Sequence, residues 1–103
     1  MHSHNVFFWL NDDLSLSAIS EFEKGLESLI TISLVKDGYF GKPADTNRSV
    51  VDRTYSYGLT LQFKSIIEHD LYQSDPAHQD FVAKNSGKWN KVLIYDLDTV
   101  ENK

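Results

Sequence analysis

Histidine is the residue type in this chain best suited to acid–base chemistry near neutral pH, and His78 has the most suggestive surroundings. Asp75 and Pro76 precede it, and the apolar pair Phe81 and Val82 follows about one turn later. Asp75 is a favourable N-cap and Pro76 suits the first helical position, so a helix is predicted to begin here. The free N–H groups and the dipole at a helix N-terminus disfavour a cation. They favour a neutral imidazole that can act as a base, although Asp75 favours protonation.

Two interpretations of His78 remain open on the sequence alone. The imidazole can be a general base that faces a cavity, or it can make a structural hydrogen bond that fixes the start of the helix. Tyr72 lies six residues earlier, across the break at Pro76, so helical spacing does not pair it with His78. Tyr72 can assist His78, or it can be a partly buried core aromatic whose hydroxyl is satisfied.

The other histidines and one acid offer weaker chemistry. His2 and His4 alternate along a strand and share a face, as a pair of metal ligands would. No third ligand follows in local spacing, and the terminus is expected to be mobile, so we predict no metal site and no cofactor. His69 lies between two acids and is expected to be solvated. Asp96 interrupts an apolar strand; it could meet water at a barrel mouth, pair across a dimer, or line the site.

Hydrophobic patterning predicts the elements that must position these side chains. Apolar residues recur at three- and four-residue spacing from Leu16 to Ile30, which indicates an amphipathic helix with Ser15 as its N-cap. Strict alternation from Thr54 to Phe63 indicates a strand with Tyr55 and Tyr57 on one face. The remaining predicted elements are strands at 6–10, 31–39 and 91–97, a loop at 44–53, a short helix opened by a Ser65–Glu68 capping box, a helix from 76 that Gly87 ends, and a tail at 98–103.

The resulting order, βαββαβ, is typical of the ferredoxin-like α+β fold, in which a four-stranded antiparallel sheet carries helices on one face. The 103 residues suit one domain spanning 1–103. Phe7 and Trp9 would then point to the uncovered face, where a soluble monomer rarely tolerates an apolar patch. A homodimer packed sheet to sheet, a dimeric α+β barrel, would bury them. The alternative is that both are scattered surface aromatics.

Composition excludes several functional classes. The net charge is −5 and the ten basic residues are scattered, so the chain lacks the basic stripe that nucleic acids require. No segment approaches the ~20 apolar residues of a membrane span, and the N-terminal apolar run is too short for a signal peptide. The absence of cysteine excludes disulfides and thiol chemistry. We therefore expect a soluble cytoplasmic protein.

Several segments together are similar to one known family. The runs SHNVFFWLNDD, GYFGK, RTYSYGLTLQFKS, HDLYQSDPAHQDFV and KVLIYDLD, in this order and spacing, resemble the stress-responsive A/B barrel (Dabb, dimeric α/β barrel) domain family, from about His4 to Asp98. The resemblance implies ferredoxin-like units that dimerise through their sheets. Most members are uncharacterised, and plant members include heat-stable stress proteins and a polyketide cyclase.

The resemblance also implies roles for individual residues. In the family's cyclase the histidine of the Pro-Ala-His run is the base and a preceding tyrosine supports it, which corresponds here to His78 and Tyr72. A histidine at the start of the first strand corresponds to His4, whereas a tyrosine on the first helix is replaced by Gly25. A glycine inside a helix costs ~1 kcal/mol, so Gly25 indicates either close packing or space for something else.

These residues lead to two functional expectations. The first is a homodimer without enzymatic activity that binds a small apolar or aromatic ligand between sheet and helices. The alternative is a cofactor-free enzyme, polyketide-cyclase-like or monooxygenase-like, with His78 as general base and Tyr72 as its assistant. Tyr57 is expected to be a pocket wall or a core aromatic. The expected ligand-binding residues are His4, Phe8, Gly25, Tyr57 and Phe81.

Overall fold

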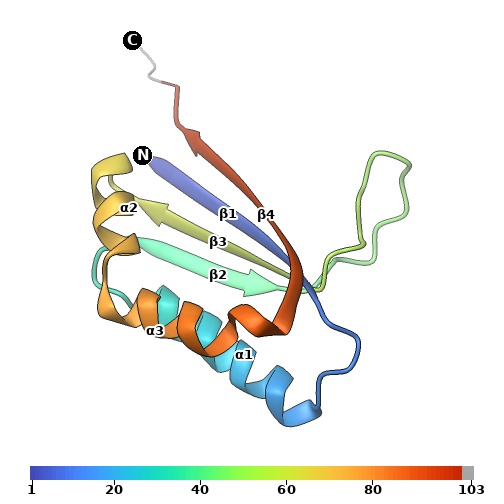
Figure 1. Cartoon of the computed structure of the whole chain (residues 1–103). Coiled ribbons are helices and arrows are strands. Elements are labelled where there is room, and N and C mark those ends of the chain that lie inside the picture. The colour runs from blue at the N-terminus through green and yellow to red at the C-terminus, as the bar shows by residue number, and fades with distance from the viewer. Residues whose placement is uncertain (101–103) are drawn as a thin grey trace.

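A four-stranded antiparallel sheet forms one layer of the structure and helices form the other (Figure 1). The computed structural model describes residues 1–100, so residues 101–103 of the predicted tail lie outside the described part. Its elements are β1 (His2–Leu10), α1 (Leu16–Ile30), β2 (Asp37–Gly41), β3 (Tyr57–Phe63), α2 (Ile66–Gln73), α3 (Pro76–Asn85), a 3-10 turn (Ser86–Lys88) and β4 (Trp89–Asp98). The sheet order is β2-β3-β1-β4, as the ferredoxin-like prediction requires.

The central strand β1 carries the side chains on which the site depends. It pairs with β3 on one side and with β4 on the other, so that His4 lies opposite both Leu61 and Asp96. Its alternation places His4, Val6 and Phe8 under the helices, where all three are buried. The apolar side chains of β1, β3 and α1 form the core between the two layers.

Local sequence signals begin the helices as predicted. Ser15 caps α1 by accepting a hydrogen bond from the Ala18 N–H at 3.1 Å. Ser65 caps α2, and its hydroxyl also donates to the Glu68 carboxylate, which completes the capping box. Each cap satisfies a backbone donor that the helix itself leaves unpaired.

The boundaries of several elements differ from the sequence prediction, and β4 spans Trp89–Asp98 rather than 91–97. β1 begins at His2 rather than at residue 6, because it pairs with β4 along its whole length. The segment 31–36 is not a strand: turn hydrogen bonds join Ile32 N–H to the Leu29 carbonyl and Val35 N–H to the Ile32 carbonyl. The third helix ends at Asn85, two residues before Gly87, and passes into the 3-10 turn.

Tyr55 and Tyr57 lie on opposite faces of the sheet, contrary to the alternation predicted from Thr54 onward. Regular pairing in β3 starts only at Tyr57, which is buried under the helices. Tyr55 instead packs against Phe7 on the uncovered face, with ring centroids 5.0 Å apart. Ser56 interrupts the alternation, because its N–H donates to the Phe8 carbonyl and its hydroxyl accepts from the Leu10 N–H.

Residues 44–53 form part of a loop between β2 and β3, as predicted, and this loop stands away from the two layers (Figure 1). Its hydrogen bonds include one from the Arg53 guanidinium to the Thr46 carbonyl at 2.8 Å. Within residues 1–100, none of the helices combines the length and apolar character needed to cross a membrane.

Candidate functional site

A cavity of about 220 Å³ lies between the sheet and the helices. Its walls come from β1 and β3, from α1, from the facing parts of α2 and α3, and from β4, which contributes Val92 and Ile94. Both of these side chains are exposed, so the cavity opens along β4. The expected site residues that line it are His4, Phe8, Tyr72, His78 and Phe81.

His78 faces this cavity from the first turn of α3. Asp75 caps that helix by accepting a hydrogen bond from the Ala77 N–H at 2.8 Å, and Pro76 occupies the first helical position. The half-buried imidazole meets Tyr72 edge to face, with ring centroids 4.8 Å apart and an interplanar angle of 66°. The chain therefore brings the two together across the helix break rather than along one helix.

The electrostatics of the pair favour two neutral groups. Burial lowers the pKa of His78, and the nearby His69 lowers it further, while the Gln73 backbone and Asp75 oppose the shift. Burial raises the pKa of Tyr72 far above its ordinary value, and the Asp75 charge adds to this shift. A neutral imidazole and a phenolic O–H thus face an apolar space, where the first can accept a proton and the second can donate a hydrogen bond.

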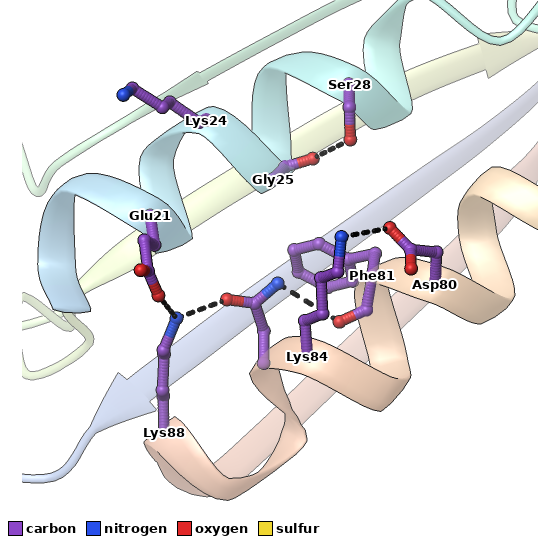
Figure 2. A pocket seen from close by; sticks show the side chains of 9 residues that line it. Glu21, Lys24, Gly25, Ser28, Asp80, Phe81, Lys84 and Lys88 are labelled. Atoms are coloured by element: carbon purple, nitrogen blue, oxygen red, sulfur yellow. Dashed lines mark hydrogen bonds and ion pairs between the residues drawn. The ribbon is translucent and has the colours of Figure 1, made fainter.

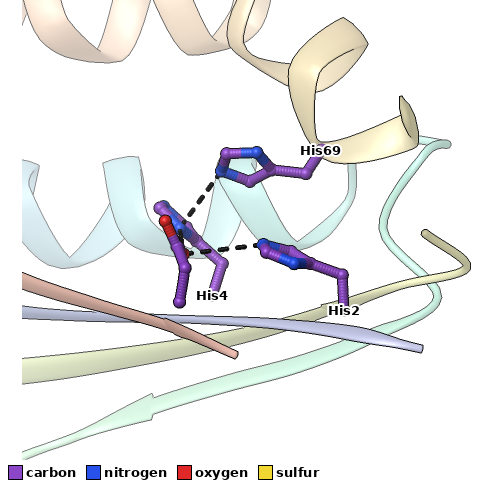
Figure 3. Close-up of side chains that lie close together, drawn as sticks. His2, His4 and His69 are labelled. Atoms are coloured by element: carbon purple, nitrogen blue, oxygen red, sulfur yellow. Dashed lines mark hydrogen bonds and ion pairs between the residues drawn. The ribbon is translucent and has the colours of Figure 1, made fainter. Parts of the chain in front are cut away.

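His4 belongs both to the cavity wall and to a cluster of polar side chains at its end (Figure 3). Its Nδ1 lies 2.5 Å from an Asp96 carboxylate oxygen and 3.2 Å from Nε2 of His69. Burial lowers the pKa of His4, whereas the hydrogen bond to Asp96 opposes that shift. Asp96 is not among the residues that line the cavity: its partly exposed side chain lies beside His4 of the same chain.

Two expectations about the histidines are wrong. His69 is not solvated: it is buried, because α2 packs that face against β1 and β3. His2 is not part of a mobile terminus, since it is buried as the first residue of β1 and its Nδ1 lies 2.8 Å from an Asp98 oxygen. Figure 3 shows both rings turned toward His4.

The burial of His69 had a signal in the sequence. Tyr72 lies three residues further along α2 and therefore on the same helix face. Ile66, Ile67 and Leu71 are exposed, so the apolar residues of this helix did not mark its buried side. The three-residue spacing between His69 and Tyr72 is the sequence feature that indicates the buried face of α2.

Two expected ligand-binding residues lie outside the cavity. Gly25 faces α3 across a separate hollow between α1 and α3 (Figure 2). A Cβ atom at this position would lie 2.8 Å from Cδ1 of Phe81, so the glycine permits close helix packing. Tyr57 is a core residue whose hydroxyl donates to the Glu23 carboxylate at 2.5 Å. Burial, with this hydrogen bond, raises the pKa of Tyr57 to about 12.

Comparison with known proteins gives the family. The family model of the Stress responsive A/B Barrel Domain, Dabb, matches residues 3–99. The chain belongs to the Dabb family. Among curated proteins, it is 28% identical over 94 residues to olivetolic acid cyclase of Cannabis sativa, which covers 90% of this chain and 91% of the cyclase.

Solved structures show the same fold. A crystal structure of an Arabidopsis thaliana protein superposes with a TM-score of 0.81 at 25% identity and covers 100% of this chain and 99% of that one. A protein of Thermobifida fusca, described as dimeric and ferredoxin-like and of unknown function, gives a TM-score of 0.77 at 16% identity. That match covers 95% of this chain and 90% of the other, and it shows the fold alone.

Proposed function

We propose that this Dabb protein is a homodimer that binds a small apolar or aromatic molecule in the cavity between sheet and helices. The observation that carries the proposal is that the cavity wall is mostly apolar and has polar groups at one part. Phe8, Phe81 and several aliphatic side chains line most of it, while His78 and Tyr72 converge on one part of it. Such a wall suits a mostly apolar ligand with one polar group, which the imidazole and the phenol orient.

The volume limits the ligand. Pockets that hold drug-sized molecules measure about 300–1,000 Å³, and this cavity, at about 220 Å³, is smaller. It suits one ring with short substituents, and a longer tail can leave through the side where Val92 and Ile94 are exposed. The uncharged state favoured for His78 and Tyr72 also disfavours a strongly anionic ligand, which would find no fixed positive charge there.

The sheet face opposite the helices supports the dimer. Phe7, Trp9 and Tyr55 form an aromatic group there, joined by Leu93 and Tyr95 of β4 around a shallow hollow of about 160 Å³. Tyr95 is 59% exposed, so this apolar surface lacks cover within one chain. The Thermobifida fusca protein, which has the same fold, is described as dimeric, and this description supports a dimer here.

A second candidate function is a cofactor-free enzyme that acts on an enolisable carbonyl compound. The identity to olivetolic acid cyclase favours it, together with the occupied positions His78 and Tyr72. The imidazole would take a proton from the carbon next to a carbonyl, and the tyrosine would donate a hydrogen bond to the oxygen that gains charge. The step transfers a proton and needs no oxidant. Gly25, where the cyclase has a tyrosine, weighs against an identical reaction.

Binding of small probes to His78→Gln protein tests the first candidate. Single-ring phenols and aryl ketones should perturb the NMR signals of Val6, Phe81 and Ile94 in the wild-type protein. His78→Gln should weaken their binding by about 10-fold, because it replaces the neutral imidazole at the polar part of the wall. The matched control is Gln79→Ala, an exposed position on the same helix, which should bind as the wild type does.

Circular dichroism must show that both variants are folded. Probes that leave the cavity signals unchanged, or that bind the His78→Gln protein as well as the wild type, contradict the proposal. The enzyme is tested on the same proteins with linear polyketone substrates. If the wild type turns these substrates over and a folded His78→Gln protein does not, catalysis is supported. If the wild type binds ligands without turnover, the binding function alone is supported.

A further inference from the structure

Four side chains from three separate elements converge at the end of the cavity. His2 and His4 come from β1, His69 from α2 and Asp96 from β4. One potential ligand atom of each lies within 4.8 Å of those of all the others. The three histidines are 2%, 5% and 4% exposed, so the cluster is enclosed on the protein side. The Asp96 side chain, 39% exposed, closes it toward solvent.

Outer carboxylates determine which ring nitrogen of two histidines faces inward. Nδ1 of His2 lies 2.8 Å from an Asp98 oxygen, and Nδ1 of His69 lies 3.2 Å from an Asp70 oxygen. An ionised carboxylate only accepts hydrogen bonds, so each Nδ1 must carry a proton. With Nδ1 as the proton-bearing nitrogen of a neutral ring, Nε2 of each histidine presents a lone pair toward the cluster. This carboxylate–histidine pairing is the arrangement that surrounds protein-bound metals.

The centre of the cluster contains more acceptors than protons. Nε2 of His2 is buried and has no hydrogen-bond partner among the described residues; the nearby Asp96 oxygen, at 3.6 Å, is itself an acceptor. Nε2 of His69 faces His4 Nδ1 at 3.2 Å and is reached by the Gln73 amide only at 3.4 Å. The single proton on His4 that binds Asp96 cannot satisfy all of these atoms, and an unsatisfied buried acceptor is costly.

The geometry points to a divalent metal site formed by His2, His4, His69 and Asp96. Three imidazoles and one carboxylate are the ligands of Zn²⁺ and related transition metals, whereas Mg²⁺ and Ca²⁺ prefer oxygen alone. With metal–ligand distances of about 2.0–2.1 Å, the ligand atoms of a tetrahedral site lie about 3.3 Å apart. The observed 3.2 Å and 3.6 Å fit this value, and the 2.5 Å contact between His4 and Asp96 would lengthen once the metal replaces the proton between them.

A metal at this site would connect three separate elements of the fold. It links α2 and the end of β4 to the start of β1, so the bound metal stabilises the folded state relative to an unfolded chain that lacks the site. His4 also lines the cavity, which places the metal next to the ligand-binding region without involving His78. The inference therefore goes beyond the proposed function and stands independently of it.

Metal titration of the untagged, metal-stripped protein tests the site. We expect one Zn²⁺ per chain, a higher thermal midpoint with Zn²⁺, and the visible absorption of tetrahedral Co²⁺ when cobalt replaces zinc. His69→Gln and Asp96→Asn should each weaken binding at least 10-fold. Asp98→Asn, which changes only an outer carboxylate, should weaken it about 10-fold.

His78→Gln is the matched control, since His78 is the one histidine outside the cluster and its loss should leave metal affinity unchanged. Asp96→Asn keeps the size of a partly exposed side chain, so this variant remains informative even if His69→Gln fails to fold. A wild-type protein that takes up no Zn²⁺ at micromolar concentration overturns the inference. So does binding that survives both Asp96→Asn and Asp98→Asn, because it would then come from surface groups elsewhere.

Discussion

Tyr72 and His78 meet edge to face, with ring centroids 4.8 Å apart, although they belong to different helices. Backbone hydrogen bonds from Ser74 to Leu71 and from Asp75 to Tyr72 turn the chain between α2 and α3. This turn places the last turn of one helix against the first turn of the next. Because this turn sets the contact between Tyr72 and His78, substitutions in the turn should affect both the stability of α3 and the protonation of His78.

The first prediction concerns the pH dependence of stability. The folded-state pKa of His78 is lower than its ordinary value of about 6.5, so between these two values the unfolded chain binds more protons than the folded chain. The stability that depends on the neutral imidazole is complete above about pH 6.5 and is lost as the pH falls through this window. Urea unfolding from about pH 8 to about pH 5 should show less loss of stability in His78→Gln than in the wild type.

These measurements require EDTA, so that metal binding to the other histidines does not contribute. His4, whose pKa is also lowered, makes the same contribution in both proteins and therefore cancels. Parallel stability curves for the two proteins would show that His78 has the same pKa in the folded and unfolded chain.

The second prediction concerns the cap of α3. Asp75→Ala removes the acceptor of the Ala77 N–H and should cost ~0.5–2 kcal/mol of unfolding free energy, measured in urea. Asp80→Ala is the control, because it removes an exposed acid of the same helix whose ion pair with Lys84 is worth only ~0.3–0.5 kcal/mol. Equal losses in the two variants would indicate that the Asp75 cap contributes no more than a surface charge.

The third prediction concerns the contact between α1 and α3. A Cβ atom at residue 25 would lie 2.8 Å from Phe81 Cδ1 and 3.0 Å from Asn85 Nδ2. Gly25→Ala should therefore destabilise the protein, because overpacking costs ~1–3 kcal/mol and outweighs the ~1 kcal/mol gain in helix propensity. Ser20→Ala, at an exposed position of the same helix, should be neutral or slightly stabilising. A thermal midpoint that rises in Gly25→Ala would refute the close packing.

The fourth prediction concerns the proposed dimer. Light scattering should give about twice the chain mass for the wild type, and Tyr95→Asp should shift it toward the monomer, because the charge would be buried without a partner between sheets. Val50→Asp introduces the same charge at a 79% exposed position in the loop and should leave the mass unchanged. A wild-type protein that is monomeric at micromolar concentration would end the dimer proposal.

The sequence alone predicted the parts of this protein that depend on neighbouring residues. The caps at Ser15, Ser65 and Asp75, the helix from Leu16 to Ile30 and the order of the elements all follow from local hydrogen bonding and apolar periodicity. These signals act within a few residues of one another, so no tertiary information is needed to recognise them. The motifs that resemble the Dabb family likewise lie in contiguous segments.

Only the tertiary structure decided which residues meet. His4, His69 and Asp96 are separated by most of the chain, and their contact depends on the register between β1 and β4 and on the face that α2 buries. Local propensity sets neither of these, because register depends on how whole strands pair and helix rotation on how the core packs. The contact between Gly25 and α3 is also tertiary. The sequence therefore could not decide whether this glycine serves close packing or the pocket, and the structure shows close packing.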